Sequence, residues 1–86
     1  MAPSPRILLV DDEPDLLDLM ELTLVKMGLE TDRANSVAEA QIRLAQTHYD
    51  LCLTDMRLGD GEGLDVVTCA SALTAPVPVA VITAYG

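Results

Sequence analysis

The sequence contains almost no aromatic side chains. Phe and Trp are absent, and the only aromatic residues are Tyr49 and Tyr85. Half of the 86 residues are nevertheless hydrophobic, which is enough apolar material for the core of one small domain. A chain of this length has no room for a second domain. We therefore expect one domain with an aliphatic core.

Positive charge is also scarce. Five Lys and Arg residues stand against 14 Asp and Glu residues, so the formal net charge is -9. Such a charge repels nucleic acid phosphates and anionic membrane surfaces at long range. No hydrophobic run approaches the ~20 residues that a membrane-spanning helix needs. We expect this segment to bind neither DNA nor membranes.

Cysteine and histidine offer no framework for a disulfide or a transition-metal site. Cys52 and Cys69 lie in apolar, regularly patterned segments, and the first residues carry no signal-peptide pattern. Both thiols are expected to be reduced packing residues. The single histidine, His48, has no partner in the sequence and is expected on the surface. These features favour a cytoplasmic protein.

Three continuous apolar runs are typical of strands buried on both faces of a parallel sheet. They cover residues 7–10, 51–54 and 79–82. The short polar segment 30–34 is predicted to be a strand at the sheet edge. Because helical segments alternate with these strands, the sequence predicts an α/β fold with a doubly wound parallel sheet.

Three helices are predicted between the strands. The first begins at Pro14, which suits a first helical turn, is stopped by Gly28, and carries apolar residues inward. These inward residues are Leu17, Met20, Leu24 and Met27. The second helix begins at Ser36, which has the capping-box spacing to Glu39. The third covers residues 64–73. It follows a glycine-rich segment, 59–63, that is predicted to be a flexible loop.

Four polar residues stand at the carboxyl ends of the predicted inner strands. Asp11 and Asp12 follow the first strand, Asp55 closes the second apolar run, and Thr83 follows the third. Ligands of open α/β sheets bind at this edge, where strand order reverses, so all four residues are expected on one rim. Three adjacent carboxylates repel one another unless a cation or a proton neutralises them. Mg²⁺, which prefers oxygen ligands, is the expected ion.

Asp55 is the predicted nucleophile of this rim. A carboxylate beside Mg²⁺ can attack a phosphoryl group and form an aspartyl phosphate, while the ion offsets charge on the transferring oxygens. Thr83 would then donate a hydrogen bond to a phosphoryl oxygen and so signal that phosphate is present. Thr83 is thus expected to be a switch residue and not a catalyst.

The blocks ILLVDDEP, LCLTDMRLGDGEGLDVV and VPVAVITAYG resemble the receiver domains of two-component response regulators. The resemblance covers residues 6–86, and residues 1–5 are expected to be a disordered lead-in. Within the family, the sequence is most similar to NtrC-type transcription activators, including regulators of type IV pilus expression. The resemblance implies a flavodoxin-like, CheY-like sheet of order 2-1-3-4-5. It also implies a phosphoprotein of a phosphorelay, with a sensor histidine kinase as phosphoryl donor.

The same resemblance assigns the metal site. It implies that Asp12 binds Mg²⁺ directly, that Asp11 acts through water, and that Asp55 is both phosphoacceptor and metal ligand. The backbone carbonyl of Arg57 would complete the ligands. Gly59 stands where the family usually has a proline, so the loop after Asp55 is expected to be looser. The domain is expected to be a signalling switch and not an enzyme, beyond Mg²⁺-assisted self-phosphorylation and self-dephosphorylation.

The resemblance also implies that Thr83 is the switch hydroxyl and that Ala84 is the small residue that lets phosphate approach. Receivers continue through a helix, a fifth strand that ends in a lysine, and a final helix. Lys26 is the only lysine here and lies on the first predicted helix. We therefore expect a partial receiver, with 79–82 as an open apolar edge that favours a homodimer or oligomer. DNA binding and transcription activation would belong to an absent output domain.

Other interpretations stay open at this point. A flavodoxin-like protein that binds FMN would need Gly, Ser or Thr in its first loop, which here has the sequence DDEP. An aspartyl-type, magnesium-dependent phosphatase would need a second carboxylate where Arg57 stands. A receiver fragment could also be inert in phosphotransfer and act only in self-association. The acidic residues Asp60, Glu62 and Asp65 are expected to form a solvated loop and helix start.

Overall fold

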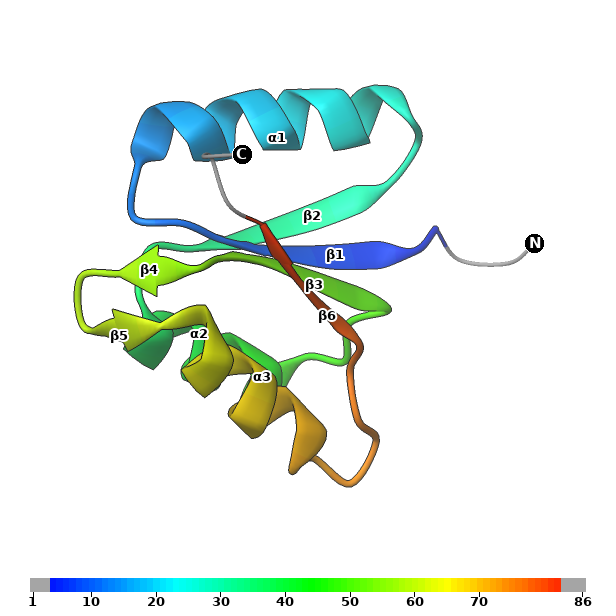
Figure 1. Cartoon of the computed structure of the whole chain (residues 1–86). Helices are drawn as coiled ribbons and strands as arrows, with labels where there is room; N and C mark the ends of the chain where they lie inside the picture. The colour runs from blue at the N-terminus through cyan, green and yellow to red at the C-terminus, as the bar shows by residue number, and fades with distance from the viewer. Residues whose placement is uncertain (1–3, 83–86) are drawn as a thin grey trace.

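The apolar run at residues 7–10 belongs to β1 (Arg6–Val10), an inner strand of a four-stranded parallel sheet (Figure 1). The computed structural model describes residues 4–82. β1 pairs with β2 (Glu30–Ala34) on one side and with β3 (Leu51–Asp55) on the other, and β3 pairs with β6 (Val79–Ile82). The order β2-β1-β3-β6 confirms the predicted doubly wound sheet, with the polar strand β2 at one edge.

The helices cover both faces of this sheet (Figure 1). α1 (Pro14–Lys26) lies on one face, and α2 (Val37–Gln46) and α3 (Gly63–Ser71) lie on the other. Successive residues of β1 therefore enter different cores. Leu8 and Val10 pack with the α2 and α3 side, whereas Ile7 and Leu9 pack with Leu17 of α1. This double burial explains why the run has no polar alternation.

The composition predicted an aliphatic core, but the observed core also contains a tyrosine. Tyr49 is the largest fully buried side chain, and its hydroxyl donates a hydrogen bond of 2.7 Å to Asp32 Oδ2. Burial, followed by the hydrogen bond to Asp32, raises the pKa of Tyr49 to about 12. Cys52 is buried, Cys69 is partly buried, and both are free thiols, which confirms their packing role. His48 is exposed, as predicted.

The prediction for the end of α1 was wrong at one residue, and the end of α3 differs from the predicted one. α1 ends at Lys26, so Met27 is its C-cap and is 68% exposed; its prediction as an inward residue was wrong. Gly28 follows with a φ of 83°, the left-handed conformation expected after a helix end. α3 ends at Ser71, before Pro76, while Leu73 still packs against the core cluster.

The glycine-rich segment after β3 forms a hairpin and not the predicted flexible loop. β4 (Arg57–Leu58) pairs antiparallel with β5 (Gly61–Glu62). A Cβ at Gly61 would lie 2.7 Å from Asp65 Oδ2, and a Cβ at Gly63 would collide with the backbone carbonyl of Asp55. These glycines permit close packing, which periodicity and composition do not reveal.

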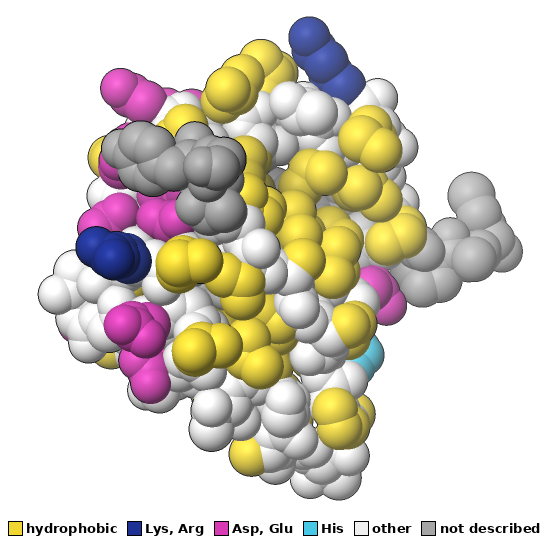
Figure 2. Space-filling view, in the orientation of Figure 1, with side chains coloured by type: hydrophobic (Ala, Val, Ile, Leu, Met, Phe, Trp, Pro, Cys, Tyr) yellow, Lys and Arg dark blue, Asp and Glu magenta, His cyan; other side chains and the backbone are white. Residues whose placement is uncertain are grey.

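β6 is the other edge of the sheet within residues 4–82. Val81 and Ile82 are 39% and 40% exposed, which confirms the predicted apolar edge in the described part of the chain. Leu22 and Val25 of α1 are also exposed. Figure 2 shows hydrophobic side chains gathered in a band across the face that carries β6. No helix in the described ranges is long and apolar enough to cross a membrane.

Candidate functional site

Three aspartates meet at the carboxyl ends of β1 and β3. Asp11 and Asp12 follow β1 directly, and Asp55 is the last residue of β3. Because Val10 pairs with Thr54 in parallel register, the two strands end side by side. Each aspartate offers a carboxylate oxygen, and these oxygens lie within 4.8 Å of one another. The sequence prediction that the three side chains share one rim is therefore consistent with the structure.

The three carboxylates differ in exposure to solvent. Asp11 is 5% exposed, Asp12 is exposed, and Asp55 is half-buried. Burial raises the pKa of Asp11, and the charges of Asp55 and Asp12 add to that shift, against the lowering effect of the hydrogen bond from Glu13. The ionised form of Asp11 is thus held at a cost in this site.

Backbone hydrogen bonds fix two of the carboxylates. The backbone N–H of Glu13 donates to Asp11 Oδ1 at 2.9 Å, and the backbone N–H of Met56 donates to Asp55 Oδ1 at 2.8 Å. The same N–H of Met56 also donates a hydrogen bond of 3.2 Å to the carbonyl oxygen of Ile82, so β6 contacts the site at this point. A second oxygen of each carboxylate stays available for a ligand.

No basic side chain of residues 4–82 neutralises this cluster. The ion pairs of the described chain join Arg6 to Glu30 and Asp32, and Arg33 to Asp18 and Glu21. The three rim aspartates take part in none of these pairs. Clustered, uncompensated carboxylates with short distances between their oxygens are a suitable donor set for a hard divalent cation.

A small cavity of about 150 Å³ adjoins the cluster. Asp11, Thr54 and Asp55 form its polar wall, and apolar side chains from α1, β3 and β6 form the rest. These apolar side chains are Leu16, Met20, Leu53 and Ile82. The carboxylates of Asp11 and Asp55 therefore border a mostly apolar pocket.

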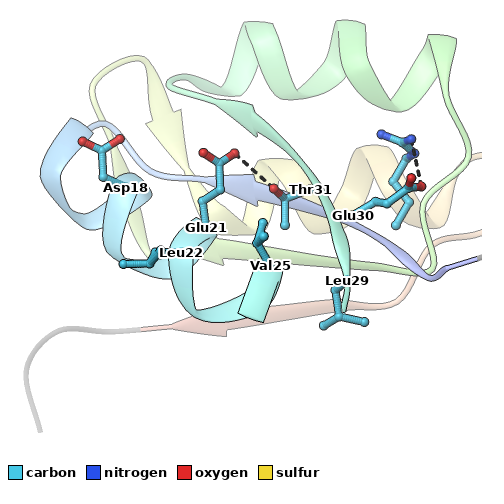
Figure 3. Close-up of a pocket in the computed structure, with 8 residues that line it drawn as sticks. Asp18, Glu21, Leu22, Val25, Leu29, Glu30 and Thr31 are labelled. Atoms are coloured by element: carbon cyan, nitrogen blue, oxygen red, sulfur yellow. Dashed lines mark hydrogen bonds and ion pairs between the residues drawn. The ribbon is translucent and has the colours of Figure 1, made fainter. Parts of the chain in front are cut away.

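A wider groove lies elsewhere, between α1 and β2 (Figure 3). Its acidic side chains already have partners. Thr31 Oγ1 donates to Glu21 Oε2 at 3.0 Å, and Arg6 pairs with Glu30 at 3.1 Å. Predicted site residues do not line it. The groove has the features of a surface depression and not of a reaction site.

The remaining predicted site residues have different outcomes. Thr83 and Ala84 lie outside the described residues, so their placement at the rim stays a prediction. Arg57 is exposed and is the first residue of β4, two positions after Asp55. Its backbone carbonyl as a metal ligand also stays a prediction.

Comparisons with known proteins fit this geometry. The family model for the response regulator receiver domain matches residues 7–86. The chain belongs to the receiver domain family of response regulators. The response regulator protein PilR of Pseudomonas aeruginosa is 53% identical over 81 residues, which are 94% of this chain and 18% of that protein.

Two further relatives support the assignment. The alginate biosynthesis transcriptional regulatory protein AlgB of Pseudomonas putida is 39% identical over 93% of this chain and 18% of its own length. Response regulator TrrA of Thermotoga maritima, in complex with Mg²⁺-BeF, superposes with a TM-score of 0.88 at 32% identity, over 95% of this chain and 71% of that chain. These matches confirm the resemblance to NtrC-type regulators. They favour the receiver family over the flavodoxin and phosphatase interpretations. The receiver sequence spans about a fifth of the length of these curated relatives.

Sequence reasoning missed Asp60 as a structural contact. It assigned this residue to a solvated loop, yet its carboxylate accepts hydrogen bonds from the backbone N–H groups of Val37 and Ala38, at 2.8 and 3.0 Å. Glu62 and Asp65 do form the expected helix start, as a capping box at α3. No pattern in the sequence indicates the Asp60 contact, because every helix begins with N–H groups that lack acceptors within the helix.

Proposed function

We propose that this receiver domain accepts a phosphoryl group on Asp55, beside a magnesium site built from Asp11 and Asp12. The observation that carries the proposal is the meeting of three carboxylates, without a basic partner among the described residues, at the end of two adjacent strands. The neighbour TrrA, described in complex with Mg²⁺-BeF, supports the choice of ion and ligand. The phosphoryl donor is a sensor histidine kinase.

The chain's own residues suit this reaction. A carboxylate oxygen of Asp55 forms a bond to phosphorus while the bond from phosphorus to the donor's nitrogen breaks, and the electron pair leaves with the imidazole. The backbone N–H of Met56 holds Asp55 Oδ1, which leaves Oδ2 as the attacking atom. Magnesium, when bound, offsets negative charge on the transferring oxygens.

The other rim residues take supporting roles in this proposal. Asp12 would bind the magnesium ion directly, Asp11 would act through water, and Arg57 would contribute its backbone carbonyl. Thr83 donates its hydroxyl to the bound phosphoryl group, and Ala84 leaves space for it. Self-phosphorylation from small donors and self-dephosphorylation by water are the only reactions of the domain itself.

The proposed setting is the cytoplasm, in a transcription activator whose output module binds DNA. The strongly negative charge of the receiver argues against DNA contact by the receiver itself. Exposed Val81 and Ile82 on β6 favour a second role, self-association through that edge. Ile82 also borders the cavity beside the carboxylate cluster, so this edge and the site are adjacent.

Labelling by a small phosphodonor tests the proposed function. With acetyl phosphate and MgCl₂, the protein should gain the mass of one phosphoryl group, and the Asp55→Asn variant should gain none. Exposed Asp15 on α1 offers a matched control, since Asp15→Asn should be labelled like the parent. Undiminished labelling of Asp55→Asn would place the acceptor elsewhere. A folded parent that is never labelled would leave self-association as the role of the domain.

A further inference from the structure

The N-terminus of α2 receives its hydrogen-bond acceptors from two different parts of the chain. Ser36 Oγ accepts from the backbone N–H of Glu39 at 3.1 Å, which is a local cap. The two earlier N–H groups, of Val37 and Ala38, instead donate to Asp60 Oδ1 and Oδ2. Asp60 thus caps a helix that lies more than 20 positions before it in the sequence. These two donors lower the pKa of the Asp60 carboxyl group.

Asp60 lies at the turn of the β4–β5 hairpin. Arg57 pairs with Glu62 and Leu58 pairs with Gly61, so Gly59 and Asp60 form the turn. The bonds from Asp60 therefore attach the turn end of the hairpin to α2. The missing side chain of Gly61 allows this approach, since a Cβ there would lie 3.1 Å from Val37 Cγ2.

The open end of the same hairpin joins the phosphorylation site. β4 begins at Arg57, one residue after Met56, whose N–H holds Asp55 Oδ1. The Met56 carbonyl accepts a 2.8 Å hydrogen bond from the N–H of Gly63, which closes the hairpin at this end. Between the two ends, Leu58 is 7% exposed and belongs to the core cluster that also contains Val37. The hairpin is a short, packed link from α2 to the backbone beside Asp55.

We propose that Asp60 is a positioning residue for magnesium binding and phosphorylation at Asp55, because it clamps the β4–β5 hairpin onto α2 and thereby fixes the backbone of Arg57 at the rim. The inference rests on the proposed function. It adds a residue that touches neither ion nor phosphoryl group and acts through the hairpin alone. Loss of the clamp frees the turn end and lets the Arg57 carbonyl move away from the ion.

A comparison of two cap variants in the full-length protein tests the inference. Asp60→Ala removes both acceptors and the link to the hairpin, whereas Ser36→Ala removes a cap of the same helix without touching the hairpin. Both variants should lower the unfolding temperature, and both should speed amide hydrogen exchange at the start of α2. Only Asp60→Ala should weaken Mg²⁺ binding, by about tenfold, as expected for an outer partner of metal ligands. NMR titration of backbone amides with MgCl₂ measures this affinity.

The Asp60→Asn variant separates the hydrogen bonds from the charge. Asn and Ala remove the same negative charge, but Asn keeps one acceptor oxygen, so its Mg²⁺ affinity should fall between those of the parent and Asp60→Ala. Equal losses in the two variants would assign the effect to charge alone and overturn the inference. So would a Mg²⁺ affinity of Asp60→Ala equal to that of Ser36→Ala.

Two further outcomes are also decisive. If Asp60→Ala does not fold, the Mg²⁺ affinity of Asp60→Asn is compared with that of the parent at high salt. High salt screens the difference in charge between the two proteins. Equal Mg²⁺ affinities under this condition would overturn the inference. If the parent binds no Mg²⁺ and gains no phosphoryl group, the proposed function itself fails. That result is distinguishable, because it does not depend on any Asp60 variant.

Discussion

Burial of Asp11 disfavours its ionised form, although the proposed function needs that form at the rim. It is nearly buried, and its pKa is raised first by that burial and then by Asp55 and Asp12. An isolated buried carboxylate would be replaced easily by an apolar residue without loss of stability. Its position next to Asp12 and Asp55 is consistent with the proposed magnesium site.

Magnesium should therefore stabilise the fold. An ion that binds the native state and not the unfolded chain adds about 2.7 kcal/mol when its concentration is about 100 times its dissociation constant. The unfolding temperature of the parent should rise with MgCl₂, and that of Asp12→Ala should stay unchanged. Exposed Asp15→Asn serves as the control, with a response like the parent's. An equal response of Asp12→Ala would remove Asp12 from the ligand set.

Because of Tyr49, the free energy of unfolding should decrease at high pH. Its native pKa of about 12 lies above the ordinary value of 10.0, so the native state keeps a proton that the unfolded chain releases in this interval. The resulting stabilisation is complete below pH 10 and is lost as the pH rises toward 12. The Tyr49→Phe variant should lose about 1 kcal/mol at neutral pH, with the Asp32 hydrogen bond, and should show a weaker decline above pH 10. Urea unfolding across this range measures both effects, and parallel declines would contradict the assignment.

Which residues could be predicted from the sequence depends on how far away their partners are. Asp11, Asp12 and Asp55 each follow an apolar run, and parallel strands end at one edge, so local patterns were sufficient. The contacts of Tyr49 and Asp60 were not predicted, because their partners, Asp32 and the start of α2, are distant in the sequence. Periodicity contains no information about such contacts.

At the scale of elements, the β4–β5 hairpin depends on close packing at glycine. A Cβ at Gly63 would collide with the backbone carbonyl of Asp55, whereas a Cβ at Gly59 would meet no atom within 4 Å. Gly63→Ala should therefore cost about 1–3 kcal/mol, the usual range for overpacking a filled site, and should impair phosphorylation. Gly59→Ala should leave both properties near those of the parent. Denaturant unfolding and acetyl phosphate labelling check the pair, and equal stabilities would argue against the close contact.

Element types were predictable, but element ends were less so. The strands and helices follow from apolar runs and helical spacing, which depend on burial alone. α1 ends one residue before Met27, where the chain turns toward the left-handed Gly28, so side-chain spacing was no guide to the last turn. The hairpin was missed because two-residue strands carry no periodic signal.

Within residues 4–82, the two edges of the sheet differ in polarity. Strand β2 is polar, and Arg6 pairs with both Glu30 and Asp32 there. β6 has no charged residue, and Val81 and Ile82 are exposed. An apolar edge with unpaired backbone groups is a template for pairing with another strand.

The 86-residue chain produced alone should therefore self-associate. Light scattering should show a mass that rises with protein concentration, and Val81→Lys, which places a charge on the exposed edge, should reduce that rise. His48, which is exposed far from β6 in sequence, provides the control variant His48→Lys, with association like the parent's. A parent that stays monomeric at high micromolar concentration would mean that the β6 edge does not drive association.

The most direct test of the proposed site is to locate the phosphoryl group chemically. An acyl phosphate on aspartate is reduced by borohydride to homoserine, which changes the residue's mass permanently and survives proteolysis. Protein phosphorylated with acetyl phosphate and MgCl₂, then reduced and digested, should carry homoserine at position 55 and at no other aspartate. Homoserine at position 11 or 12, or a phosphoryl group that resists borohydride, would contradict the assignment of Asp55 as the acceptor.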